Sequence, residues 1–108
     1  MGSDPERSNL SEVTDLDRMV HEPARLAVMS LLYVLESADF TFVMNQTGLT
    51  WGNLSAHLSK LEEADYIKIE KGFKGKRPQT TLSLAPKGRE AFQDYARKIK
   101  SLFKDLPA

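Results

Sequence analysis

Four basic side chains fall within seven residues of the chain, with no acidic residue among them. They are Lys71, Lys74, Lys76 and Arg77, and Gly75 makes the segment between them flexible. Ammonium and guanidinium groups at this spacing can neutralise the phosphates of a nucleic acid. An isolated basic run is also typical of a solvated loop, so the surrounding elements decide between the two interpretations.

Just before the basic run lies a segment of small and polar residues. Leu54, Leu58 and Leu61 recur at helical spacing, which predicts a helix from about 50 to 64 with one buried stripe. The opposite face carries no acidic side chain before Glu62, so nothing there would repel phosphates. Such a helix fits the major groove of DNA, about 12 Å wide, where amide and hydroxyl groups can bond base edges. The candidate DNA contacts on this helix are Thr50, Gly52, Asn53, Ser55, Ala56, Ser59 and Lys60.

Three further helices are predicted ahead of this one. Apolar residues at helical spacing indicate an amphipathic helix over about 10–20. A proline opens a second helix over about 23–37, which is apolar nearly all round and so indicates a core helix that also meets a second subunit. A short helix over about 42–47 follows. Gly48 is well placed as its left-handed C-cap, and Thr50 as the N-cap of the next helix.

Two runs of alternating apolar and polar residues follow and predict a β-hairpin. Residues 66–71 form the first run, and Leu82 and Leu84 face inward in the second. Residues 72–78 between them are expected to form a flexible basic loop. Two helices joined by a turn and followed by a hairpin make a winged helix-turn-helix, a mainly α fold with a small β-hairpin (α+β), whose wing spans about 66–84. The candidate DNA contacts on the wing are Lys74, Lys76 and Arg77.

A last helix is predicted from about 86 to 106, with an apolar stripe whose period is near 3.5. This period is typical of a seam between two helices, so we interpret the helix as an added C-terminal dimerisation element. The alternative is that its aromatic residues line a ligand pocket between subunits. The predicted dimer contacts are Phe92, Tyr95, Ile99, Leu102, Phe103 and Leu106.

Composition restricts the class of protein further. The 108 residues, 41% of them hydrophobic, indicate a single domain over 10–108 after a flexible segment over 1–9. The chain has no cysteine, which excludes a disulfide framework and thiolate metal sites. No apolar run approaches the roughly 20 residues of a membrane-spanning helix, and we expect a cytoplasmic protein. The zero net charge hides an asymmetry, because residues 1–22 hold six acids and two bases, whereas residues 60–100 hold eleven bases and six acids.

The chain resembles the winged-helix transcriptional regulators of the MarR and ArsR type, and in particular their stand-alone DNA-binding domains. The resemblance covers roughly residues 15–106. It implies a homodimer that binds a palindromic operator, usually as a repressor, in a prokaryote. The matching segments are Glu22–Leu26, Thr47–Thr50, Gly52–Ala64, Lys71–Phe73, Lys76–Thr80 and Pro86–Arg89.

Two features depart from the family pattern. A glycine is usual where Asp65 stands, so we expect that helix end to be capped differently. Metal sensors of the ArsR type use clusters of cysteine or of histidine and aspartate, and this chain has no cysteine and only His21 and His57. We therefore expect no metal and no cofactor. Because no catalytic constellation is recognisable either, we expect no enzyme.

Three side chains near the candidate DNA contacts have a structural interpretation that we favour. His57 and Trp51 flank the leucine stripe and are expected to pack or hydrogen-bond at its edges, although the Trp51 indole N–H could instead reach a phosphate. Phe73 is expected to pack back on the hairpin.

The sequence as a whole predicts a sequence-specific regulator that binds double-stranded DNA as a homodimer and acts as a repressor. A small-molecule effector stays open. The alternative is a winged-helix module that binds protein within a larger transcription assembly, since this fold serves both purposes.

Overall fold

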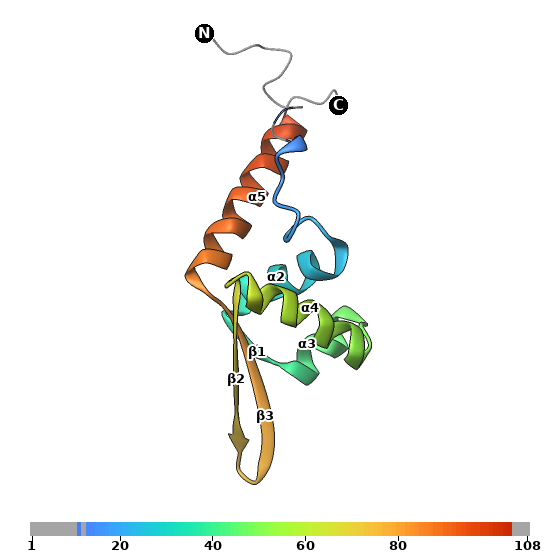
Figure 1. The fold of residues 1–108 in the computed structure, drawn as a ribbon, viewed down its shortest axis with the longest axis vertical. Helices are drawn as coiled ribbons and strands as arrows, with labels where there is room; N and C mark the ends of the chain where they lie inside the picture. The colour runs from blue at the N-terminus through green and yellow to red at the C-terminus, as the bar shows by residue number, and fades with distance from the viewer. Residues whose placement is uncertain (1–10, 12, 105–108) are drawn as a thin grey trace.

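The computed structural model describes residue 11 and residues 13–104. The described helices and strands run in the order α2, β1, α3, α4, β2, β3, α5, and the three strands form an antiparallel sheet in the order β1-β3-β2. Figure 1 shows the β2–β3 hairpin extending from one side of the helices and α5 from the other. This is the predicted winged helix, mostly helical with a small hairpin. The elements are α2 (Pro23–Leu35), β1 (Ser37–Asp39), α3 (Phe40–Thr47), α4 (Trp51–Glu63), β2 (Ile67–Lys74), β3 (Arg77–Leu84) and α5 (Pro86–Lys104).

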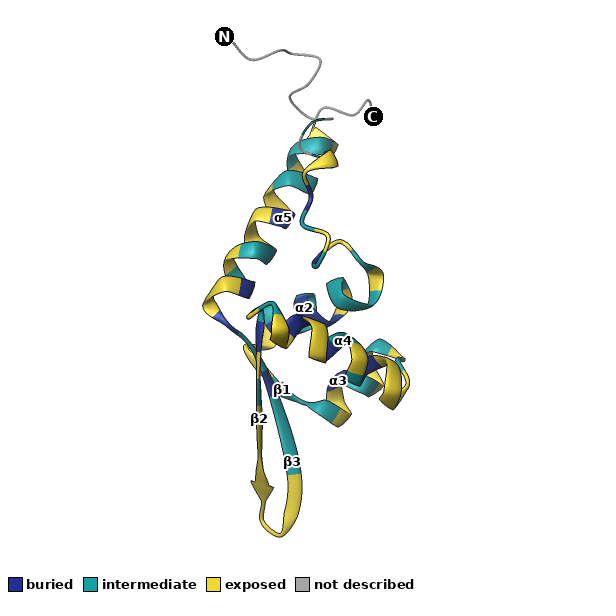
Figure 2. Ribbon diagram, in the orientation of Figure 1, coloured by how far each residue is buried: buried dark blue, intermediate teal, exposed yellow. Residues whose placement is uncertain are grey.

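The core lies where α2, α3 and α4 meet the base of the hairpin, as the dark blue segments of Figure 2 show. The leucine stripe of α4 is confirmed, since Leu54 and Leu61 have no exposed surface and Leu58 has 3%. Of the helices in the described part of the chain, none combines the length and apolar character needed to cross a membrane. The most buried side chains of the core are Val20, Val28, Met29, Leu32, Val43, Leu54, Leu61, Ile67 and Leu82.

The turn between α3 and α4 has the two caps that the sequence predicts. Gly48 has a φ of 73°, and its N–H donates to the carbonyl of Met44 at 3.0 Å. The Thr50 hydroxyl accepts a hydrogen bond from the Asn53 N–H at 3.1 Å. Both caps act within a few residues of the chain, and together they fix the start of α4 against α3.

The N-terminal helix is shorter than predicted. Residues 13–14 are helical, but the chain leaves the helix at Asp15. Asp17 accepts hydrogen bonds from the N–H groups of Met19 and Val20 at 2.8 and 3.4 Å, and this local turn competes with a helix. Val20 is nevertheless fully buried, so its apolar character reflects a loop that folds onto the core. Residues 1–9 and Leu10 lie outside the described residues.

A short strand that the sequence did not predict follows α2. The helix ends at Leu35 instead of Ser37, because Glu36 takes a φ of 68°. Residues Ser37–Asp39 then pair with β3, with Ala38 opposite Leu82. The carboxylate of Asp39 accepts a hydrogen bond from the Phe42 N–H at 2.7 Å, and this cap starts α3 at Phe40, two residues earlier than expected.

The loop expected over 72–78 is mostly strand. The ladder continues to the pair Lys74 and Arg77, so only Gly75 and Lys76 form the turn. Gly75 has a φ of 65°, which glycine adopts without steric cost. Pro78 is tolerated in β3 because β1 pairs only with residues 81–83, which leaves one side of the strand without a neighbour at that point.

The end of α4 also differs from the expectation. Asp65 has a φ of 63°, the left-handed conformation in which a glycine is usual. The N–H of Tyr66 donates to the carbonyl of Leu61 at 2.8 Å, and the N–H of Asp65 donates to that of Glu62 at 2.9 Å. These two bonds form a Schellman motif. The expectation of a different cap is therefore wrong, since the residue changes while the geometry stays.

Candidate nucleic-acid interface

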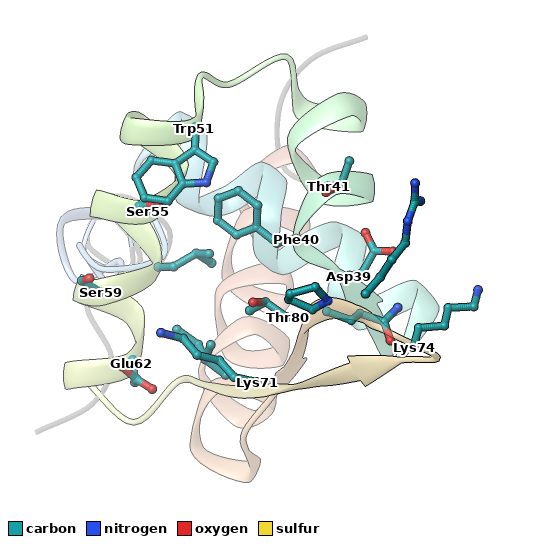
Figure 3. A pocket seen from close by; sticks show the side chains of 15 residues that line it. Asp39, Phe40, Thr41, Trp51, Ser55, Ser59, Glu62, Lys71, Lys74 and Thr80 are labelled. Carbon is teal, nitrogen blue, oxygen red and sulfur yellow. The ribbon is translucent and has the colours of Figure 1, made fainter.

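A groove of about 1070 Å³ separates α4 from the β2–β3 hairpin (Figure 3). Trp51, Ser55 and Ser59 follow one another along the α4 side of this groove. The start of α3 and the end of β1 contribute Phe40, Thr41 and Asp39. The hairpin side is lined by Ile69, Lys71, Lys74, Arg77, Pro78, Gln79 and Thr80.

The structure places two of the predicted contacts of α4 in this groove and others outside it. Ser55 and Ser59 line it, whereas Asn53 and Lys60 lie on the far side of the exposed face. Gly52 has no other group within 4 Å of the position that a Cβ would take. The exposed surface of α4 is therefore shallow and open to close approach. The predicted contacts of α4 that are exposed are Thr50, Gly52, Asn53, Ala56, Ser59 and Lys60, and Ser55 is half-buried.

The wing contacts lie together at the end of the hairpin. Lys74 and Arg77 are opposite each other in the register and both line the groove, while Lys76 lies in the turn. All three side chains are exposed. Among residues 13–104, none of them forms an ion pair with a carboxylate. These cations are therefore available to an anionic partner.

Acidic groups border the groove at two points. The Asp39 carboxylate is already engaged in capping α3. Glu62 lies in the last turn of α4, and Glu63 beside it is exposed. The N-terminal half of the helix, in contrast, carries no acid and presents the free N–H groups of its first turn. This half of α4 is therefore better suited than the end at Glu62 and Glu63 to approach a polyanion.

His57 lies behind α4, away from the groove. Its Nδ1 is 3.2 Å from the Arg25 guanidinium and 3.3 Å from the Glu22 carboxylate. Burial raises the pKa of Glu22, but hydrogen bonds from the N–H groups of Ala24 and Arg25, with the nearby His57 and Arg25 side chains, outweigh it and lower the pKa overall. The Arg25 Nε also donates to the Met19 carbonyl at 2.8 Å. This cluster attaches α4 to α2.

A second contact ties the N-terminal loop to the base of the wing. The Tyr66 hydroxyl donates a hydrogen bond to the carboxylate of Asp17. Burial and this bond raise the pKa of Tyr66 to about 12. Gly88 packs directly on Tyr66, since a Cβ there would lie 1.9 Å from the Tyr66 carbonyl oxygen. The loop, the wing and α5 thus meet at one residue.

Helix α5 shares its apolar stripe between its own chain and the solvent. The Phe92 ring lies 4.9 Å from that of Tyr33, and the Tyr95 hydroxyl lies 2.7 Å from His21 Nδ1. Tyr95 is only 7% exposed and belongs to the core, and Ile99 is partly buried against it. Farther along, Leu102 is half-buried and Phe103 is 63% exposed. Leu106 lies outside the described residues.

The structure corrects the interpretation of two aromatic residues and adds two residues to the groove that were not named from the sequence. Trp51 contacts Phe40, with ring centroids 5.9 Å apart, but it remains 67% exposed instead of packing fully. Phe73 is 75% exposed, so the expectation that it packs back on the hairpin is wrong. Gln79 and Thr80 line the groove as well, and the alternation of β3 could have identified Thr80 on the face of Leu82. In the described part of the chain, no three potential metal-ligating side chains come together.

A helix-turn-helix, a three-stranded sheet and a basic hairpin beside the second helix define a winged-helix domain with the fold of transcription regulators of the MarR type. The chain belongs to the winged helix DNA-binding domain family, whose model matches residues 24–103. It is 34% identical over 89 residues to the uncharacterized protein MJ0432 of Methanocaldococcus jannaschii, which covers 82% of this chain and 97% of that protein.

Solved structures share this fold. A transcriptional regulator homologue from Pyrococcus horikoshii OT3 superposes with a TM-score of 0.83 at 26% identity, over 89% of this chain and 99% of that one. Reduced AbfR bound to DNA superposes with a TM-score of 0.67 at 15% identity, over 96% of this chain and 72% of that one. The fold is thus the one found in these regulators, and the family is that of winged helix DNA-binding domains.

Proposed function

We propose that the protein binds double-stranded DNA sequence-specifically as a homodimer in the cytoplasm and represses transcription. One observation carries this proposal. The acid-free half of α4 and the unpaired cations Lys74 and Arg77 face the same groove, with Lys76 at the adjacent tip. Duplex DNA has a phosphate backbone on each side of each of its grooves, and the helix and the wing together match this arrangement.

In this proposal, α4 enters the major groove by its N-terminal end. Asn53 and Ser55 are placed to hydrogen-bond base edges, and Lys60 to neutralise a phosphate. The small side chain of Ala56 and the absence of one at Gly52 allow the helix to approach the bases closely. The acidic end at Glu62 and Glu63 stays away from the phosphates.

The wing contacts the flanking DNA. Lys74 and Lys76 follow the backbone, and Arg77 reaches the adjacent minor groove, where narrowing deepens the negative potential. Because the strands continue to Lys74 and Arg77, the hairpin presents these cations on a regular ribbon and not on a flexible loop. Less conformational entropy is lost on binding as a result.

Two copies pair through the outer part of α5. Phe103 and Leu102 supply apolar surface that the chain does not use in its own core, and we expect Leu106, which lies outside the described residues, to extend it. A two-fold dimer places two α4 helices on half-sites about one helical turn, roughly 10 bp, apart. The operator is then palindromic, and occupation of a promoter by the dimer blocks transcription.

Selection from a random duplex library, followed by hydroxyl-radical footprinting, tests this function. We expect one enriched palindrome and two protected patches about 10 bp apart. Promoter DNA that contains this palindrome should lose transcription in vitro when the protein is added. Failure to enrich any sequence, with no footprint, would contradict the proposal and favour a protein-binding module.

A further inference from the structure

We propose that Phe73 is an apolar wedge that inserts between base pairs where the wing contacts the minor groove, and that it bends the duplex there. This inference rests on the proposed DNA binding and adds to it a residue that shapes the DNA. Phe, Leu and Ile side chains are known to enter base steps in this way, and the duplex then bends toward the major groove.

The exposure of Phe73 is the first observation. At 75% it is the most exposed aromatic side chain among the described residues. The neighbouring residues of the hairpin tip are also exposed, so the phenyl ring contributes no packing to the wing. An aromatic ring held in water on a protruding hairpin is available to a partner.

The position of Phe73 in the ladder is the second observation. Its partner across the hairpin is Pro78, which lines the groove. The alternation of the strand puts Phe73 and Pro78 on the same face of the ribbon as Ile69 and Leu82. The wing therefore carries an apolar pair one step inside the cationic pair at its tip.

The charges around this pair select the partner. Lys71, Lys74 and Arg77 surround it, and no acidic residue occurs between Lys71 and Arg89. A protein surface that accepts Phe73 would also have to supply anions on both flanks, whereas a DNA minor groove has a phosphate backbone on each side and apolar base faces between them. The proximity of the acid-free half of α4 favours DNA for the same reason.

The backbone of the wing is rigid enough to support a wedge. Because the turn has only two residues and the ladder is unbroken from Ile67 to Lys74, the hairpin holds the backbone of Phe73 at a fixed position. A loop of seven residues would have lost this rigidity.

The test compares Phe73→Ala and Phe73→Leu with the unchanged chain on a 30-bp duplex that carries a dye at each end. Energy transfer between the dyes reports the bend, and anisotropy reports the affinity. We expect Phe73→Ala to weaken binding about tenfold and to abolish most of the bend, without changing the salt dependence. Phe73→Leu keeps an apolar wedge and should retain most of both.

Lys76→Ala is the matched control at the same tip. It should lower the salt dependence while the bend at saturation stays, because it removes a charge and no wedge. Thermal melting of both Phe73 variants should match that of the unchanged chain, since an exposed ring contributes little to folding.

Three results would overturn the wedge. If the unchanged chain binds duplex but Phe73→Ala binds and bends it equally well, the wedge is wrong and the proposed function stands. If Phe73 affects binding to vesicles of anionic phospholipid and leaves DNA bending unaltered, the ring serves a membrane instead. If the unchanged chain binds no duplex at about 50 mM salt, the wedge and the proposed function fail together.

Discussion

At the scale of single residues, Asp65 shows how a residue other than glycine can take the left-handed position of a helix cap. A residue other than glycine in the left-handed region costs about 1 kcal/mol, which aspartate reduces only in part. We expect Asp65→Gly to raise the free energy of unfolding by about 0.5–1 kcal/mol, as thermal or urea denaturation would show.

Ala64→Gly is the control for this prediction. Ala64 precedes Asp65 in a right-handed conformation with a φ of −78°. Glycine gains nothing there and increases the entropy of the unfolded chain, so the variant should be less stable by up to about 1 kcal/mol. A loss of stability in Asp65→Gly as well would show that the Asp65 side chain itself contributes to the Schellman motif.

Tyr66 makes the stability of the protein sensitive to high pH. Its pKa is raised to about 12 in the folded chain, against 10 for the free side chain. The folded state therefore holds the phenol proton more tightly, and this contribution is complete below pH 10 and is lost as the pH rises toward 12. We expect the free energy of unfolding to fall over that window in urea titrations. Tyr66→Phe should show a shallower decline, and an equal decline in both proteins would contradict the role given to this phenol.

At the scale of elements, the proposed contact of the wing with DNA depends on the charge of its lysine and arginine side chains. Each phosphate contact contributes about 0.9 to the slope of log affinity against log salt. Lys74→Ala should therefore flatten the slope by about one unit for each subunit and weaken binding to all sequences alike. Lys100→Ala, which removes an exposed lysine from α5, should leave the slope unchanged. An unchanged slope in Lys74→Ala would exclude this residue from the backbone contact.

The direction in which α4 enters DNA is a separate prediction for this element. Asn53 lies in the first turn and Glu63 in the last, and both are exposed. We expect Asn53→Ala to relax sequence preference, costing about 1–3 kcal/mol on the selected site and little on other DNA. Glu63→Gln should change the affinity less than twofold. A large gain from Glu63→Gln would mean that α4 lies flat in the groove.

How far the sequence predicts these elements depends on where their determinants lie. Helix α4 is predicted to within one residue because its caps and its leucine stripe lie inside the segment itself. Strand β1 was missed because Ser37–Asp39 has no alternating pattern and becomes a strand only by pairing with β3. The N-terminal helix was predicted too long because the Asp17 side chain competes locally with the helix, which apolar spacing alone does not reveal.

The candidate site was predicted less completely than the fold. Exposure of polar residues on α4 and of the wing cations follows from helical and strand periodicity, and these residues lie where they were expected. The exposure of Trp51 and Phe73 does not follow from periodicity, because it depends on how far the hairpin stands from α4. An aromatic residue in sequence favours a buried position, and only the three-dimensional arrangement reverses that preference.

At the scale of the whole molecule, the proposed binding to a palindrome depends on dimerisation through α5. Phe103→Glu places a charge where the second copy would pack, while the core around Tyr95 stays untouched. We expect sedimentation to show a monomer with an unaltered circular dichroism spectrum. Affinity for the palindrome should fall to that for a single half-site. A dimer that persists in Phe103→Glu would move the interface elsewhere, for example to the exposed Val34 of α2.

The most direct test of DNA binding is a fluorescence anisotropy titration of duplex DNA with the full chain at several salt concentrations. We predict micromolar binding to non-specific duplex at about 50 mM salt. If a dimer contacts about eight phosphates, log affinity should fall against log salt concentration with a slope near −7. Absence of binding at about 50 mM salt would contradict the proposed DNA binding and assign the groove between α4 and the wing to a protein partner.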